Sequence, residues 1–554
     1  MSRLFEQHKA TLEAALAAAA SRAYWSAYPE VPSGKSYGET AKDEGAAAFK
    51  AMLGQRFALD QPGSGAWAGA EESPYGFPLG ITYPQATVAQ LVAAAEAAQA
   101  AWASASIEAR VGACLEILHR LNRRSFEIAN AVMHTTGQGF AMAFQAGGPH
   151  AQDRGLEATA YAYAEMKRVP ARARWEKPQG KGDPLRLDKD FAILPRGVAL
   201  VIGVSTFPTW NGYPGLFASL ATGNAVIVKP HPGAVLPLAL TVRVAREVLK
   251  EQGFDPNLVL LAADVPAAPL TKELVTHPAI GIVDYTGGPA FAGWLAENAR
   301  GKQLYVEGAG INTVVIDGTA DFKGMCQNLA FSLSLYSGQM CTAPQNLFVP
   351  RQGIETDEGR KSFDDVARAI AGAVEKLLAD PERAAGILGA VQSPATLARV
   401  AEAAKLPGVL LAPRPAPVAG FERARTSTPV VVAADARDAA LFEREWFGPI
   451  AFVVATDSTA QSLALAAGCA RRMGAITAAA YATDPAVLAA AETAFRAAGV
   501  PLSENLTGGI YVNQSAAFSD FHVTGANPAG NACLTDTAFV AGRFRVVAVR
   551  RPAA

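Results

Sequence analysis

The spacing of hydrophobic residues along the chain predicts where helices lie. From Val88 to Val132 apolar residues recur at intervals of three and four, the period of a helix with one buried face. The stretch before it is helical to about Ala23 and then rich in proline, glycine and aromatic residues. We therefore expect an N-terminal extension over residues 1–80, followed by amphipathic helices. Glu13 interrupts the alanine-rich start, which favours a helix over a secretory signal.

The middle of the chain alternates short apolar runs with helix-like segments. Such alternation is typical of a parallel, doubly wound α/β sheet, in which buried strands read as continuous apolar runs. The predicted strands are Gly197–Val204, Ala225–Pro230, Leu258–Asp264, Ala279–Gly287 and Lys302–Gly310.

A second series of apolar runs begins at Asn312 and predicts a second α/β domain. Its predicted strands read NTVVID, NLFVP, VVVAA, AFVVA and, at Gly508–Asn513, GGIYVN. The chain therefore has two α/β units in succession.

Two further segments have the pattern of an exposed arm. Residues 167–189 are basic and broken by prolines. This favours a hairpin over a nucleic-acid patch, which would interleave aromatic residues, because Trp175 is the one aromatic residue in the segment. The chain ends in RFRVVAVRRPAA, which predicts a terminal strand. An unpaired strand exposes its backbone groups, so we expect it to pair with another subunit.

Charge and composition exclude several classes of function. The formal net charge of −1 over 554 residues gives no reason to expect nucleic acid or an anionic membrane surface as a partner. The sequence has no run of about 18 uncharged apolar residues, so we expect no membrane span.

Histidines and cysteines show no metal-binding or disulfide pattern. No two histidines are four residues apart and none accompanies a CxxC pair, so we expect no metal site. The five cysteines are odd in number and widely spaced, which argues against a disulfide framework and suits the reducing cytoplasm, where we expect the protein to be located. The histidines are His8, His119, His134, His150, His231, His277 and His522.

Cys341 stands apart from the other cysteines because its surroundings are polar. It lies in SGQMCTAPQN, whereas buried structural cysteines usually lie among aliphatic residues. A reactive cysteine needs a nearby base or a lowered pKa. Glu307 ends a predicted strand and is followed by glycines, so it could face a cleft, although a solvated loop glutamate would give the same pattern.

Several motifs, in their order and spacing, resemble those of the aldehyde dehydrogenase superfamily over roughly residues 85–550. The strand-end glutamate of that family matches Glu307 in VEGAGIN, and its nucleophile loop matches Cys341 in GQMC at the family's usual interval. Its Lys-Pro pair matches Lys229 in VIVKP. The phosphate-side motif matches YTGG, with Thr286, Gly287 and Gly288, and the ribose and nicotinamide motif matches EWFGP, with Glu445 and Phe447.

The resemblance implies an NAD(P)-dependent oxidation of an aldehyde to a carboxylic acid. Cys341 would attack the aldehyde, and hydride loss from the thiohemiacetal would leave a thioester on the same sulfur. Glu307 would then act as general base for its hydrolysis. Lys229 and Glu445 would contact the cofactor riboses, and Phe447 would support the nicotinamide ring.

The resemblance also implies a domain organisation. A Rossmann-like cofactor domain would comprise residues 81–166 and 195–306, and the catalytic domain residues 307–537. An oligomerisation arm would comprise residues 167–194 and 538–554. Relatives dimerise through such arms, so a homodimer or a dimer of dimers is expected.

Two positions depart from the family pattern. The family commonly has an asparagine whose amide binds the oxyanion, and the spacing places Thr206 there, with Asn211 five positions later. We therefore expect Thr206 to supply the second oxyanion donor. The family's adenosine-ribose glutamate is replaced by Pro232. Without that carboxylate a 2′-phosphate is not repelled, so NADP is favoured over NAD.

Long, unusual segments resemble the phenylacetic acid degradation (PaaN) group within this superfamily. They include the opening LFEQHKATLEAAL and, at Phe521–Asp536, FHVTGANPAGNACLTD. This resemblance implies a substrate that is a CoA thioester bearing a terminal aldehyde, formed by ring cleavage in aerobic phenylacetate breakdown.

Two alternatives remain open. A CoA-acylating aldehyde dehydrogenase is one, because TGGP at Thr286–Pro289 occurs in that branch, although such enzymes usually lack the glutamate base. The other is a catalytically silent relative that binds CoA esters, which only the substitution at Thr206 supports.

Overall fold

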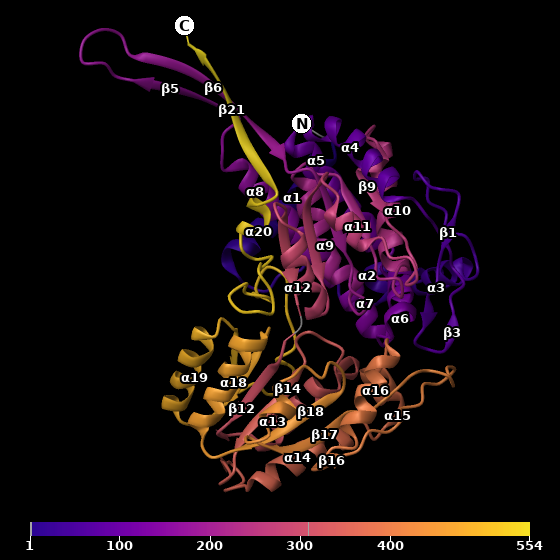
Figure 1. Ribbon diagram of the computed structural model, residues 1–554, viewed down its shortest axis with the longest axis vertical. Coiled ribbons are helices and arrows are strands. Elements are labelled where there is room, and N and C mark those ends of the chain that lie inside the picture. The colour runs from indigo at the N-terminus through magenta and orange to yellow at the C-terminus, as the bar shows by residue number, and fades with distance from the viewer. Residues whose placement is uncertain (1–2, 309, 554) are drawn as a thin grey trace.

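The computed structural model describes residues 3–308 and 310–553, so Ala309, in the glycine-rich turn after Glu307, lies outside the described residues. Two α/β bodies lie one above the other, and a long three-stranded arm extends from the upper one (Figure 1). Within the described residues, no helix combines the length and the apolar character needed to cross a membrane.

The N-terminal extension packs onto the first body. Its long first helix, α1, buries Leu4, Phe5 and Leu12 against α5 and α8, which confirms the expected helix. Its remaining elements are short. The helices of this region are α1 (Arg3–Ser21), α2 (Gly34–Tyr37) and α3 (Ala41–Met52), and the strand pairs are β1 (Trp67–Ala68) with β4 (Tyr83–Pro84) and β2 (Glu72–Ser73) with β3 (Phe77–Pro78).

The predicted helical region is divided into several helices by capping residues. Thr87 and Ser106 each accept a hydrogen bond from the backbone at their helix starts, and Gly137 ends a helix in the left-handed conformation. The helices are α4 (Val88–Ser104), α5 (Ile107–Arg123), α6 (Ser125–Thr136), α7 (Phe140–Gly147) and α8 (Pro149–Lys167).

The first sheet is parallel, in the order β11-β10-β7-β8-β9. Strands β7, β8 and β9 are buried along their whole length, as expected for a sheet covered on both faces. The strands are β7 (Val198–Ile202), β8 (Val226–Lys229), β9 (Val259–Leu261), β10 (Ile280–Thr286) and β11 (Gln303–Glu307). The accompanying helices are α9 (Pro208–Ala221), α10 (Leu236–Glu251), η1 (Pro256–Leu258), α11 (Thr271–Thr276) and α12 (Pro289–Asn298).

The second sheet has the order β16-β17-β18-β14-β12-β19-β20, and only β16 runs antiparallel to its neighbour. Its strands are β12 (Asn312–Ile316), β14 (Pro344–Pro350), β16 (Val409–Leu411), β17 (Val430–Asp435), β18 (Ile450–Thr456), β19 (Ala478–Tyr481) and β20 (Leu502–Glu504). The helices are α13 (Phe322–Ser334), η2 (Leu335–Gly338), α14 (Phe363–Leu377), α15 (Pro381–Leu388), α16 (Pro394–Ala403), α17 (Ala439–Phe442), α18 (Thr459–Met473) and α19 (Pro485–Ala497). A small pair, β13 (Gly318–Thr319) with β15 (Glu355–Thr356), lies beside it.

The prediction of a strand at GGIYVN is wrong. Residues 508–513 form turns and loop, and Ile510 is 66% exposed. Tyr511 stacks on Phe331, and the Asn513 side chain donates a hydrogen bond to the carbonyl of Ser332. The sheet positions are instead taken by β19, whose alanines fit the buried interior beside β12, and by β20.

The arm is an antiparallel sheet in the order β21-β6-β5. Its strands are β5 (Arg172–Lys177), β6 (Leu185–Pro195) and β21 (Phe544–Pro552), and α20 (Ala538–Ala541) precedes the last of them. The expected hairpin is therefore present. The terminal strand, expected to pair with another subunit, pairs along its whole length with β6 of the same chain. Its second edge has no strand partner among the described residues.

A buried ion pair fixes the base of the arm to the first sheet. Arg543, fully buried, donates hydrogen bonds to both carboxylate oxygens of Asp284 on β10, at 2.8 and 2.6 Å, and to the Ser219 hydroxyl. An isolated charge in this interior would be strongly unfavourable, so each group depends on the other.

We expect Arg543→Ala to destabilise the protein by about 3–5 kcal/mol, because Asp284 would be left buried without its partner. Arg545→Ala, at an exposed position two residues later, is the matched control and should have little effect. Thermal unfolding of the two variants measures the difference. Equal unfolding temperatures would show that the arm is held by other contacts.

Candidate active site

Glu307 is the last residue of β11, and a late loop of the chain holds this strand end in place. The Gly308 amide donates to the carbonyl of Ala529, and the Val306 amide donates to the Asn531 side chain. These contacts place the loop of residues 521–536 beside Glu307 and leave the carboxylate half-buried at the carboxyl edge of the first sheet.

Cys341 follows a turn of unusual backbone conformation. Tyr336, Ser337 and Gly338 have φ of +52°, +49° and +61°, so three consecutive residues are in the left-handed region, two of them with side chains. The Tyr336 hydroxyl donates to the carbonyl of Thr136 at 2.6 Å, and the Ser337 hydroxyl donates to the carbonyl of Leu388. Buried hydrogen bonds therefore hold a backbone that would otherwise relax, which is common at functional sites.

Polar side chains around Cys341 fix the rest of its loop. Gln339 donates to the carbonyls of Tyr336 and Ala390, and its own side-chain oxygen accepts the Gln392 amide. Asn312, at the start of β12, donates to the carbonyl of Cys341 at 2.7 Å. The polar residues of SGQMCTAPQN thus have a largely structural role. The side-chain amides of Gln339 and Asn312 make hydrogen bonds to backbone groups that a helix or strand would otherwise satisfy.

Gln345 links this loop to EWFGP. Its amide nitrogen donates to the carbonyls of Phe442 and Arg444, and its oxygen accepts the Trp446 amide at 2.8 Å. The segment that carries Glu445 and Phe447 is therefore placed by a residue four positions after Cys341.

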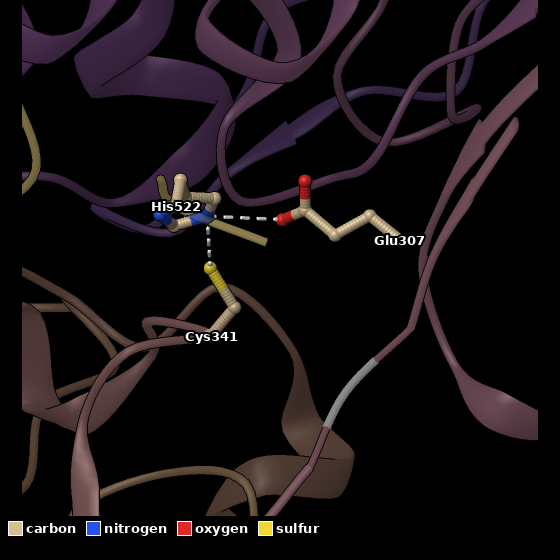
Figure 2. A group of neighbouring side chains, drawn as sticks. All are labelled: Glu307, Cys341 and His522. Carbon is tan, nitrogen blue, oxygen red and sulfur yellow. Dashed lines mark hydrogen bonds and ion pairs between the residues drawn. The ribbon is translucent and has the colours of Figure 1, made fainter. Parts of the chain in front are cut away.

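The two sheets bring Cys341 and Glu307 together at one imidazole (Figure 2). His522 Nε2 lies 3.5 Å from Cys341 Sγ and 3.2 Å from Glu307 Oε1. On the other side of the ring, His522 Nδ1 lies 3.0 Å from the Ser515 hydroxyl. Asn211, on α9, donates to Glu307 Oε1 at 3.2 Å.

The environment affects the two ionisable groups in opposite directions. Burial raises the pKa of the Cys341 thiol well above its ordinary value, and the neighbouring Glu307 charge raises it further. Burial alone would raise the pKa of Glu307, but His522, the Arg154 charge and the Asn211 amide together lower it. The resting site therefore holds a carboxylate beside a thiol.

Thr206 and Asn211 occupy different places. Thr206, in the turn before α9, is buried, and its backbone carbonyl accepts a hydrogen bond from Gln138. It is not among the described residues that line the two cavities beside Glu307 and Cys341, whereas Asn211 lines one of them and contacts Glu307. The assignment of Thr206 as oxyanion donor stays a prediction.

The positions expected to bind a cofactor lie at the ends of strands around the same region. Lys229 ends β8, buried, with Nζ 2.8 Å from Asp264 Oδ1. Glu445 and Phe447 precede β18 and are half-buried, and burial raises the pKa of Glu445 to about 7.

The turn at Thr286, Gly287 and Gly288 leads from β10 into the N-terminus of α12. A Cβ at Gly288 would meet no atom within 4 Å, so the turn leaves open space where an anion could approach the free backbone amides of the helix. A buried lysine, a half-buried carboxylate and an open helix N-terminus beside strand ends fit a dinucleotide.

A cavity of about 700 Å³ reaches Cys341 and His522. Its lining mixes aromatic and polar side chains, and the N-terminal extension contributes to it. Among the described residues that line it, none is lysine or arginine. The residues contributed by the extension are Tyr24, Trp25, Ser26 and Glu30.

His522 is the functional position that sequence reasoning missed. No motif marks it, since its partners are 181 and 215 residues away in the chain. The one feature of the sequence that could have indicated His522 is its place in the unusual segment FHVTGANPAGNACLTD.

The side-chain atoms of Glu307, Cys341 and His522 that could bind a metal lie within 4.8 Å of one another. We assign no metal to them.

A solved structure and two curated relatives show what the chain is similar to. The crystal structure of an NAD-dependent aldehyde dehydrogenase from Burkholderia multivorans is 57% identical, with a TM-score of 0.99 and full coverage of both chains. N-succinylglutamate 5-semialdehyde dehydrogenase of Burkholderia lata is 28% identical over 424 residues, covering 74% of this chain and 77% of the relative.

Propanal dehydrogenase (CoA-propanoylating) of Citrobacter freundii is 28% identical over 226 residues, covering 40% of this chain and 48% of the relative. The chain thus spans less than half the length of the first curated relatives it matches. The model of the aldehyde dehydrogenase family matches residues 81–516. The chain therefore belongs to the aldehyde dehydrogenase family.

Proposed function

We propose that the protein oxidises an aldehyde to a carboxylic acid with NAD or NADP. The observation that carries this proposal is the meeting of Cys341 and Glu307 at His522, beside a large cavity that Cys341 and His522 line. A nucleophile and a carboxylate base on either side of one reaction centre suit the formation and hydrolysis of a thioester.

Each residue has one task in this scheme. The Cys341 sulfur bonds to the aldehyde carbon, and the resulting alkoxide is stabilised by backbone and side-chain donors. When bound, the nicotinamide supplies the acceptor for the hydride that leaves this carbon. Glu307 then takes a proton from the water that cleaves the thioester, a task that suits a carboxylate with a lowered pKa.

A CoA-acylating enzyme is the second candidate, since the first curated relatives are named for that activity. In such a reaction free CoA, and not water, would take the acyl group. The position of Glu307 beside Cys341 favours water. Product identification with and without CoA distinguishes the two, and a silent CoA-ester-binding relative would form neither product.

The substrate that we propose is the CoA-linked semialdehyde of phenylacetate ring cleavage. Its support is the sequence resemblance of the N-terminal and Phe521–Asp536 segments. Because lysine and arginine are missing from the described cavity lining, the phosphates of the CoA part would lie outside, and only the aldehyde end would enter.

The cofactor proposal includes both NAD and NADP. Pro232 brings no carboxylate to repel a 2′-phosphate, which favours NADP. Asp264 neutralises Lys229, which removes a cation that would attract that phosphate. The Burkholderia multivorans structure is named as NAD-dependent, which supports NAD.

We further propose that two copies of the chain associate through the arm. One edge of β21 has no strand partner among the described residues, and apolar side chains of the arm are exposed. These exposed side chains are Leu185, Leu194, Val546, Val547 and Val549.

Cys341→Ala should abolish aldehyde oxidation and leave NAD and NADP binding intact, because the sulfur acts on the aldehyde and not on the dinucleotide. Cofactor reduction and fluorescence titration measure the two properties. Cys114→Ala, in the core of α5, is the control and should stay active. Substantial turnover in Cys341→Ala would remove the assigned nucleophile.

Glu307→Gln should slow thioester hydrolysis much more than hydride transfer, because the amide cannot take a proton from water. Rapid mixing should then show a burst of about one equivalent of reduced cofactor per site, followed by slow turnover. If the burst is absent and steady turnover is unchanged, Glu307 is not the base.

Asn211→Ala should slow turnover by up to about 10²-fold, because Glu307 loses the amide that orients it. Thr206→Val keeps the shape of Thr206 and deletes its hydroxyl, and it should cost less. Turnover at saturating cofactor compares the two. A larger loss in Thr206→Val would mean that Thr206 is the oxyanion donor, as the spacing in the sequence predicts.

A further inference from the structure

We propose that His522 is a catalytic residue that removes the thiol proton of Cys341 when the sulfur attacks. The later use of the sulfur on an aldehyde rests on the proposed function, but the proton transfer itself does not. Among the described side chains, His522 is the nitrogen base within reach of the sulfur, with Nε2 at 3.5 Å from Sγ.

The proposed transfer starts from one tautomer of the ring. When Nδ1 carries the proton it can donate to the Ser515 hydroxyl at 3.0 Å, and Nε2 then offers its lone pair to the thiol. After transfer the new Nε2–H lies between the sulfur and Glu307 Oε1, at 3.2 Å from the carboxylate. The carboxylate thus stabilises the charged ring, as orienting carboxylates do for other catalytic histidines.

The ring is held where this contact requires it. His522 is buried, and Trp210 packs against it edge-on with ring centroids 4.6 Å apart. The Arg154 guanidinium lies over the Trp210 ring, 3.5 Å from the ring centroid. This contact keeps the indole in place. The imidazole cannot easily turn away from the sulfur.

A base in contact with the sulfur is needed because burial raises the pKa of the Cys341 thiol and makes it hard to ionise. Besides Glu307, the other acidic and basic side chains lining the cavities that His522 faces are Glu30, His150, Asp153, Arg154, Glu157, Asp284 and Asp520. Among the described side chains that line these cavities, only His522 combines contact with Sγ and a ring nitrogen that can accept a proton.

The proton balance closes over one cycle. The S–H proton moves to Nε2, the sulfur bonds to the aldehyde carbon, and the carbonyl electron pair becomes the alkoxide pair. Hydride leaves to the cofactor and the thioester forms. Water then adds, with one proton going to Glu307, and the C–S bond breaks. His522 returns its proton to the departing sulfur, and Glu307 releases its proton to solvent.

The test measures the thiol directly, in the full chain without aldehyde or cofactor. Iodoacetamide alkylates the sulfur, and mass spectrometry of the peptide with Cys341 follows the rate against pH. We expect His522→Gln, which keeps a polar side chain but no base, to be alkylated at least about tenfold more slowly at pH 7. His119→Gln, an exposed histidine on α5, is the control and should match wild type.

Equal rates and pH profiles in wild type and His522→Gln would overturn the proposal. A failure of the proposed function would instead leave this difference in place, because alkylation needs neither aldehyde nor cofactor. Added imidazole should speed alkylation of Cys341 in His522→Ala, an effect that a packing role would not produce. If His522→Gln does not fold, Ser515→Ala tests the same contact, because it keeps the imidazole ring and removes the hydrogen-bond partner of Nδ1. We expect this variant to be alkylated more slowly than wild type. An unchanged alkylation rate in Ser515→Ala would also contradict the proposal.

Discussion

The site depends on one contact between parts of the chain that belong to different sheets. The carboxyl end of β11 brings Glu307, the turn before β14 brings Cys341, and a late loop brings His522 between them (Figure 2). In parallel α/β sheets, side chains at the carboxyl ends of strands face a common crevice. The second sheet closes this crevice with the amino end of β14, so Cys341 and Glu307 meet where the two bodies join.

Hydrogen bonds from surrounding residues hold the strained backbone that places Cys341 at this contact. Three left-handed residues precede Cys341, and two of them are held by bonds to Thr136 and Leu388 from other elements. Gln345 fixes EWFGP to the same loop, so the predicted cofactor segment is joined to the loop that carries Cys341. The geometry of the site therefore rests on hydrogen bonds made by residues around Cys341 and Glu307.

Much of this could be predicted from the sequence, because strands buried on both faces leave a clear apolar pattern. Glu307 and Cys341 were both predicted, since each lies in a local motif. His522 could not be, because its role arises from contacts with distant residues. GGIYVN was misread because apolar and aromatic residues that line a cavity resemble a strand, and the pairing of β21 with β6 depends on tertiary structure that no local pattern encodes.

The most direct test of the central claim is the mass of the enzyme during turnover. Glu307→Gln is mixed with an aldehyde and cofactor, quenched in acid, and digested for mass spectrometry. The account predicts that the peptide with Cys341 carries the acyl group as a thioester. An unmodified Cys341 together with continued formation of acid, or an acyl group on another residue, would contradict it.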